Sequence, residues 1–173
     1  MRFTEKYVKK IMNKGQDNSI QVWGCINYYE GTGSLTKYEG RLNGQRYEKE
    51  IIEDSLIPYL KSCGYANNNC FFMQDNAPCH KQNLFHQKFL EEHNILLFSD
   101  WPANSPYINP IENLWAFIEK KTLLRNPKTK FEFWKFLQEE WTNIPLDFIQ
   151  LLINSLPERI CAVKKSKGGY TKY

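Results

Sequence analysis

Cys70-Phe71-Phe72-Met73 is a four-residue apolar run without a polar side chain, and the turn sequence Gln74-Asp75-Asn76-Ala77-Pro78 follows it at once. A run this short, bounded by turn residues, predicts a strand rather than a helix. Because it does not alternate with polar residues, the strand is expected to be buried on both faces. Burial on both faces requires helices on each side of the sheet, so the sequence predicts an α/β protein.

The pattern around this run predicts a hairpin followed by alternating helices and strands. The predicted strands cover 20–29, 34–38, 70–73 and 95–98, and the predicted helices cover 43–61, 81–93, 109–124, 131–141 and 146–156. A hairpin joined to such a pattern predicts one domain over residues 1–173, with a mixed sheet flanked by helices. The predicted core comprises Val22, Trp23, Ile26, Phe71, Phe72, Ile95, Leu97, Leu114, Trp115 and Ile118.

Composition narrows the class of protein without identifying it. Hydrophobic residues make up 42% of the chain and aromatic residues 15%, which is too rich for a disordered segment. A net charge of +4 permits a polyanionic partner but does not require one. Five cysteines without paired close spacing indicate reduced thiols. No apolar run approaches the roughly 18 residues of a membrane span, so we expect no membrane partner and a nuclear or cytoplasmic location.

Asp75 comes directly after the buried strand, at the carboxyl edge where ligands and catalytic groups gather in open α/β sheets. Its position, more than its identity, makes it a candidate site residue. The alternative interpretation is a structural turn, in which the Asp75 carboxylate accepts hydrogen bonds from nearby backbone groups. Both interpretations stay open on these residues alone.

Glu112 is the second candidate, and it also has a structural alternative. Asn109, Pro110 and Glu112 together form a helix-start pattern, in which the glutamate can serve as part of a cap. On a helical wheel, however, Glu112 borders the apolar stripe instead of opposing it. It can therefore emerge beside the sheet edge. The adjacent Cys79 and His80 lack two further matched ligands, so a packing role is favoured over a metal pair.

Three segments together resemble, in order, the markers of the mariner superfamily of DDE transposases. They are Val22-Trp23-Gly24-Cys25, residues 74–80 (Gln-Asp-Asn-Ala-Pro-Cys-His) and residues 101–115, from Trp101 to Trp115. The carboxyl end, from Ile153 to Arg159 and from Lys167 to Tyr173, is similar to the end of that family. The resemblance therefore runs over nearly the whole chain.

The resemblance implies a ribonuclease-H-like fold, in which three carboxylates hold two magnesium ions for DNA strand cleavage and transfer. It makes Asp75 the second carboxylate and Glu112 the third, both as catalytic residues and as metal ligands. Mg²⁺ or Mn²⁺ is the implied cofactor. Since Mg²⁺ dehydrates reluctantly, two carboxylates are expected to hold one ion weakly and not to fix two.

The family's first carboxylate belongs to a strand upstream of the Val22-Trp23-Gly24-Cys25 segment. Asp17 stands where the family has a glycine-rich turn, so no first aspartate can be assigned. We therefore expect the sheet to lack its first strand, and the chain to lack the family's helix-turn-helix DNA-binding region. Tyr107 also replaces the aspartate that commonly follows Ser-Pro in the family. The expected result is a DDE endonuclease domain that is inactive alone.

The alternative to an enzyme is a non-catalytic module that binds DNA or associates with full-length transposase. A lysine-rich tail would supply the nucleic-acid contacts, through Lys164, Lys165, Lys167 and Lys172. Contacts between lysine and phosphate position a protein on DNA but do not read its sequence, so binding is expected to be non-specific and salt-dependent. Self-association is a further possible partner interaction.

Overall fold

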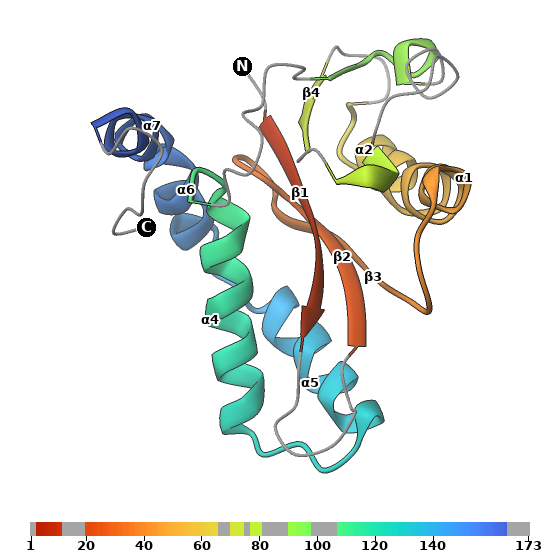
Figure 1. The fold of residues 1–173 in the computed structure, drawn as a ribbon, viewed down its shortest axis with the longest axis vertical. Coiled ribbons are helices and arrows are strands. Elements are labelled where there is room, and N and C mark those ends of the chain that lie inside the picture. Colours follow the sequence, from red (N-terminus) through yellow and green to blue (C-terminus); the bar gives the residue numbers. More distant parts are fainter. Residues whose placement is uncertain are drawn as a thin grey trace.

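The structure is a computed structural model that describes residues 3–11, 20–65, 70–74, 77–80, 90–97 and 107–165. For residues 3–11 it describes the backbone alone. Five strands form one sheet in the order β3-β2-β1-β4-β5 (Figure 1). Their bounds are Phe3–Ile11 (β1), Ile20–Asn27 (β2), Gly31–Tyr38 (β3), Cys70–Met73 (β4) and Ile95–Leu97 (β5). β1, β2 and β3 pair antiparallel, whereas β4 and β5 run parallel to β1, which confirms a mixed sheet.

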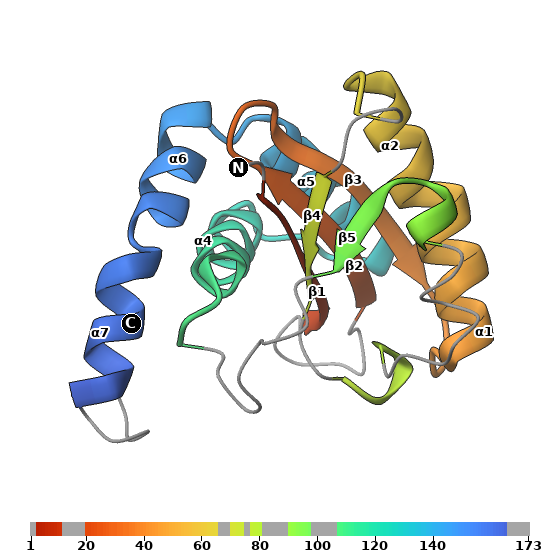
Figure 2. The same cartoon turned by 90° about the horizontal axis from the view of Figure 1, so that it is seen from above.

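Helices cover both faces of the sheet, as Figure 2 shows from above. One face carries α1 (Gly44–Arg46), the π-helix η1 (Tyr47–Leu56) and α2 (Ile57–Ser62), which continue one another. The other face carries α4 (Pro110–Leu124), α5 (Lys130–Thr142) and α6 (Leu146–Asn154). α7 (Leu156–Lys165) extends from α6, and a short 3-10 helix, η2 (Pro78–His80), follows β4. No helix in the described part of the chain is long and apolar enough to span a membrane.

Strand β2 shows why the sheet needs two helical layers. Val22 and Ile26 point into a core with α4, α5 and α6, whereas Trp23 and Cys25 point into a second core with η1 and α2. Successive side chains of a strand point to opposite faces, so one strand supplies both cores. Eight of the ten predicted core residues are buried, and the other two, Phe71 and Leu97, are half-buried.

Gly24 lies between Val22 and Ile26 on one face of β2, and its lack of a side chain lets two tryptophan rings approach the backbone. The rings of Trp115 (α4) and Trp141 (α5) stack with centroids 5.0 Å apart. A Cβ atom on Gly24 would lie 2.8 Å from Cη2 of Trp141 and 3.0 Å from Cη2 of Trp115. The Trp141 Nε1 group donates a hydrogen bond to the Gly33 carbonyl oxygen at 2.8 Å, which ties α5 to β3.

β1 is a strand that the sequence pattern did not predict. We expected the sheet to lack its first strand, but Phe3–Ile11 lies between β2 and β4 at the centre of the sheet. Its backbone pairs with all eight residues of β2, and Glu5 is in register with Met73 of β4. The stretch was missed because four lysine and glutamate residues interrupt its β-forming residues, while a central strand usually reads as a nearly continuous apolar run. β1 contains no aspartate.

Several predicted helices differ in detail from the structure. The predicted helix over 43–61 is present, and its Asn43 cap is confirmed because the side chain accepts from the Arg46 N–H at 2.9 Å. Its middle is a π-helix, and Pro58 in the following turn has no N–H to donate. The predicted helix over 146–156 ends at Asn154, and α7 begins at Leu156. Of the helix predicted over 81–93, residues 81–89 lie outside the described residues.

Candidate active site

Asp75 comes shortly after the end of β4 in the sequence. Asp75 itself lies outside the described residues, but the residue before it, Gln74, is buried at the carboxyl end of the strand. The Gln74 Oε1 atom accepts a hydrogen bond from the Tyr47 hydroxyl of η1 at 2.9 Å. Because this contact spans 27 residues of sequence, it fixes the end of β4 against the helical layer.

The same tyrosine also contacts the chain after Asp75, at His80. His80, at the end of η2, is 3% exposed, and its ring centroid lies 4.7 Å from that of Tyr47. Tyr47 therefore contacts residues on both sides of Asp75 in the sequence. Within the described residues, no group of three or more His, Cys, Asp or Glu side chains is placed to hold a metal. The packing role predicted for His80 agrees with these contacts.

Glu112 is the third residue of α4, at the position that the helix-start pattern predicts. The Asn109 side chain accepts a hydrogen bond from the Ile111 N–H at 3.1 Å, and Pro110 occupies the first turn. The Glu112 N–H donates to the Asn109 carbonyl oxygen at 3.2 Å. The partial positive charge of a helix N-terminus favours an anionic carboxylate in this turn.

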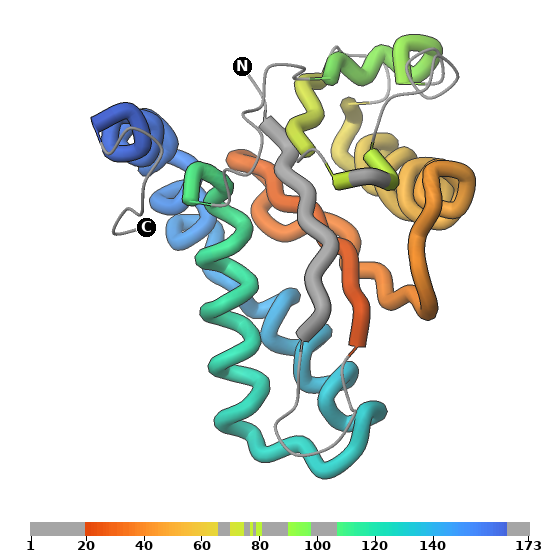
Figure 3. Tube along the Cα trace, viewed as in Figure 1, coloured from red at the N-terminus to blue at the C-terminus, as the bar shows by residue number. Residues whose placement is uncertain are grey.

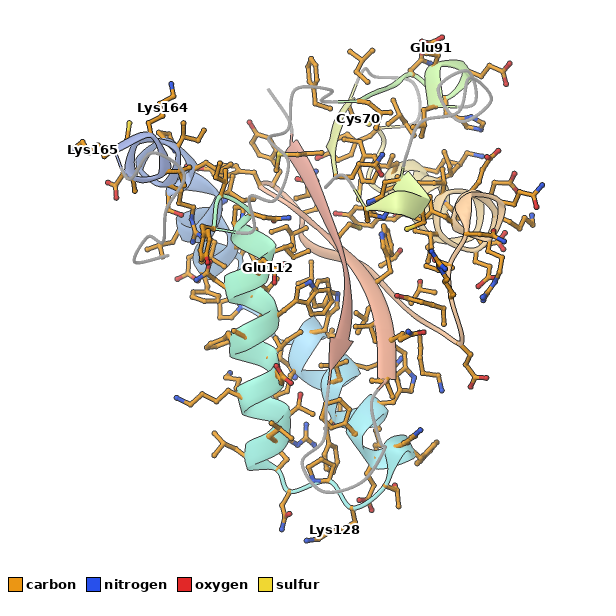
Figure 4. All side chains as sticks on the ribbon, in the orientation of Figure 1. Cys70, Glu91, Glu112, Lys128, Lys164 and Lys165 are labelled. Atoms are coloured by element: carbon orange, nitrogen blue, oxygen red, sulfur yellow. The ribbon has the colours of Figure 1, made fainter. Side chains whose placement is uncertain are left out.

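The side chain of Glu112 borders the buried face of α4, as the helical wheel predicts. It is half-buried, whereas Leu114, Trp115 and Ile118 on that face are fully buried. Figure 4 shows Glu112 on the side of α4 that faces the sheet, and α4 lies against β1. Since β1 is the immediate neighbour of β4, α4 and the end of β4 both adjoin the same strand. The separation of the Asp75 and Glu112 carboxyl groups stays a prediction, at less than about 10 Å.

Arg159 fixes the start of α4 from the far end of the chain, and the sequence analysis missed this role. The side chain is 2% exposed. Its Nη1 group donates to the Asn113 Oδ1 atom at 2.6 Å and to the Tyr107 carbonyl oxygen at 3.2 Å. Its Nε group donates to the Ser155 Oγ atom at 2.7 Å. Asn113 is the neighbour of Glu112, so α7 holds the turn of α4 that presents the carboxylate.

Comparison with known proteins now identifies the family. Residues 5–134 match the family described as DDE superfamily endonuclease. The chain belongs to this family. The Tcb2 transposase of Caenorhabditis briggsae is 33% identical over 177 residues, covering 99% of this chain and 60% of that protein. The Tc1 transposase of Caenorhabditis elegans is 34% identical over 176 residues, with the same coverage. The chain thus spans about 60% of the length of these curated relatives.

Solved structures of Mos1 transposase share the fold. The catalytic domain of Mos1 transposase, solved with raltegravir and Mn, superposes with a TM-score of 0.82 at 21% identity, covering 98% of this chain and 84% of that one. The Mos1 mariner paired end complex with Mn gives a TM-score of 0.79 at 19% identity, covering 98% and 56%. This likeness confirms the predicted ribonuclease-H-like fold.

The lysines expected to bind nucleic acid are only partly described. Lys164 and Lys165 are exposed, but they occupy the last turn of α7 and not a tail, which corrects the predicted end of the helical region (Figure 4). The correction has a simple cause, since lysine is a good helix former and Leu156 begins a new helix after α6. Lys167 and Lys172 lie outside the described residues.

Proposed function

We propose that this DDE endonuclease-family chain is a DNA strand-cleavage and strand-transfer domain with an incomplete metal site. Residues 1–173 supply only two of its carboxylates. The observation that carries the proposal is the placement of Glu112 in the capped first turn of α4, beside the strand that adjoins β4. β4 in turn leads directly into Asp75. A ribonuclease-H-like fold in a DDE family supports reading these two residues as carboxylates of one site.

Asp75 and Glu112 are the residues proposed to hold Mg²⁺ or Mn²⁺. Both offer the hard oxygen ligands that these ions require, and the half-buried position of Glu112 suits a ligand that must be partly shielded from water. A bound ion would activate the attacking hydroxyl or stabilise the leaving oxygen of a phosphodiester. The protein's own part is to fix the two carboxylates, through Tyr47 and Gln74 on one side and Arg159 on the other.

The proposed incompleteness rests on β1. This strand occupies the centre of the sheet beside β4, yet Glu5 is its only acidic residue and it carries no aspartate. With two carboxylates, two divalent ions would face too few anionic ligands, so occupancy of the second ion should collapse. A thousandfold loss of rate corresponds to only about 4 kcal/mol of barrier, and it would look like inactivity in an ordinary assay.

The test is nicking of supercoiled plasmid by the chain with Mg²⁺ and with Mn²⁺. We expect no nicking by residues 1–173, and metal-dependent nicking by a version in which the family's aspartate-bearing strand replaces β1. The same replacement carrying Asp→Ala is the matched control. Clear nicking by the original chain, lost on Asp75→Ala or Glu112→Ala, would show that two carboxylates suffice.

A second candidate function is a non-catalytic module that binds DNA or associates with full-length transposase or with itself. The exposed Lys164 and Lys165 at the end of α7 favour it. This function predicts salt-sensitive DNA binding or co-assembly without nicking by either version of the chain. Nicking by the version with the replaced β1 would argue for the enzymatic function instead.

A further inference from the structure

A second basic region lies at the corner where α4 ends and α5 begins. Residues 120–135 carry six basic side chains and one acidic side chain, a local net charge of +5, whereas the whole chain carries +4. This corner is therefore a strongly basic stretch, as is the carboxyl end, where Lys164 to Lys172 carries four lysines and no acidic residue. Figure 3 shows the chain turning there, at the end of α4, whereas Glu112 lies in the first turn of that helix.

Two of the six basic side chains are already engaged by acidic partners. Arg125 pairs with Glu139 and Glu140, and Lys121 pairs with Glu140 at 3.8 Å. The other four make none of the ion pairs or side-chain hydrogen bonds found among the described residues, and all four are exposed. They are Lys120, Lys128, Lys130 and Lys135, which we call the corner lysines.

Apolar side chains at this corner are exposed to an unusual degree. Phe131 is 77% exposed and Leu124 is 76% exposed, the largest values among the large hydrophobic side chains of the described residues. The backbone beneath them is fixed. The Thr129 hydroxyl caps α5 by accepting from the Glu132 N–H at 3.1 Å, and the Glu132 carboxylate accepts from the Lys128 N–H at 2.7 Å. The cap thus holds Lys128, Lys130 and Phe131 on one firm turn.

We propose that this corner is a DNA-binding surface, at which the corner lysines contact phosphates and Phe131 lies against the sugars or bases. The inference rests on the proposed function, because it takes DNA as the substrate. Unpaired lysines bind the phosphates of a nucleic acid, and an exposed aromatic ring beside them can pack on its sugars or bases. An acidic protein could also form ion pairs with the lysines, but such pairing does not require an exposed aromatic ring among them.

The position of the corner fits a substrate bound at Glu112. Leu124 is twelve residues beyond Glu112 on α4, which is about 18 Å along a helix at 1.5 Å per residue. Successive base pairs rise by about 3.4 Å, so this length corresponds to roughly five base pairs. Figure 4 shows Glu112 near one end of α4 and Lys128 beyond the other. The corner would then hold the duplex about five base pairs from the bond at the carboxylates.

Three double variants of the whole chain test the inference, each removing two exposed positive charges. Lys128→Gln/Lys130→Gln changes the corner, Lys164→Gln/Lys165→Gln changes the end of α7, and Lys37→Gln/Lys61→Gln, on β3 and α2, is the control. The probe is a fluorescein-labelled 20-base-pair duplex of arbitrary sequence, with affinity measured by anisotropy from 50 to 300 mM salt. Circular dichroism checks that each variant is folded.

We expect the corner variant to bind on the order of tenfold or more weakly, with a salt slope shallower by about 1.8, because two phosphate contacts are lost. The control should keep the wild-type affinity apart from a small effect of net charge. Phe131→Ala should weaken binding about fivefold, because the ring no longer buries about 40 Å² of apolar surface against the sugars, and should leave the salt slope unchanged. Wild-type affinity in this variant would refute the role of the ring.

The outcomes separate this inference from the proposed function. If the wild-type chain binds DNA and the corner variant matches the control, or if only the α7 variant loses affinity, the corner is not the DNA surface and the proposed function stands. If the wild-type chain does not bind the duplex even at 50 mM salt, DNA is not its partner, and both proposals fail together.

Discussion

Replacing Gly24 with alanine should destabilise the protein, although most glycines in regular structure can take a methyl group at little cost. The new Cβ would lie 2.8 Å from the Trp141 ring and 3.0 Å from the Trp115 ring, closer than carbon atoms approach without strain. Neither ring can move away freely. Trp115 is fully buried, and the Trp141 Nε1 group is held by the Gly33 carbonyl oxygen.

The size of the effect follows from two opposing terms. Overpacking of this kind costs about 1–3 kcal/mol. Alanine also restricts the unfolded chain, which favours folding by about 0.4–1 kcal/mol. The net loss should be about 1–2 kcal/mol, and for a chain of 173 residues each kcal/mol lowers Tm by roughly 2–4 °C. Gly24→Ala should therefore unfold several degrees below the wild type.

Gly44→Ala is the matched control. A Cβ on Gly44 would meet no atom within 4 Å, so the entropic term acts alone and should stabilise the protein by about 0.4–1 kcal/mol. Urea unfolding followed by circular dichroism gives both values. Trp141→Phe in the Gly24→Ala background should relieve the clash, giving a favourable coupling of about 1 kcal/mol in a double-mutant cycle. If both alanine variants are stabilised equally, the two rings yield without cost and the close approach does not constrain the fold.

Three further changes test the supports of the site. Arg159→Met should lower the free energy of unfolding in urea by about 2–4 kcal/mol, because it removes three hydrogen bonds and leaves the Asn113 oxygen without this donor. Amide exchange should also rise in the first turn of α4, and unchanged exchange there would contradict the anchoring role. Tyr47→Phe should cost about 1–3 kcal/mol, since the buried Gln74 oxygen loses its donor; a wild-type urea midpoint would show that the bond is dispensable. Burial raises the pKa of Glu48, so the folded state binds this proton more tightly and stability falls as the pH rises through the folded pKa. Glu48→Gln should therefore stabilise the protein at pH 7, and the difference should vanish below the unfolded pKa; a gain that persists in acid would exclude this cause.

Much of the fold could be read from local patterns. Cys70–Met73 and the hairpin strands were predicted from apolar runs and turn residues, and the cap of α4 from Asn109 and Pro110. These signals lie within a few residues of one another, so they act before any tertiary contact forms. β1 escaped prediction for the opposite reason. Its lysine-rich sequence suits a sheet centre only when β2 and β4 are already in place to pair with it.

The candidate site also has one part that local sequence predicts and another part that it does not. Sequence by itself determined that Asp75 follows a buried strand and that Glu112 lies at the start of a helix, because strand ends and helix caps are set by neighbouring residues. Only the tertiary structure decided what supports them. Tyr47 reaches Gln74 across 27 residues, and Arg159 reaches Asn113 across 46. No periodicity in the sequence encodes such contacts, since they arise when layers pack and buried donors must find the acceptors that packing leaves nearby.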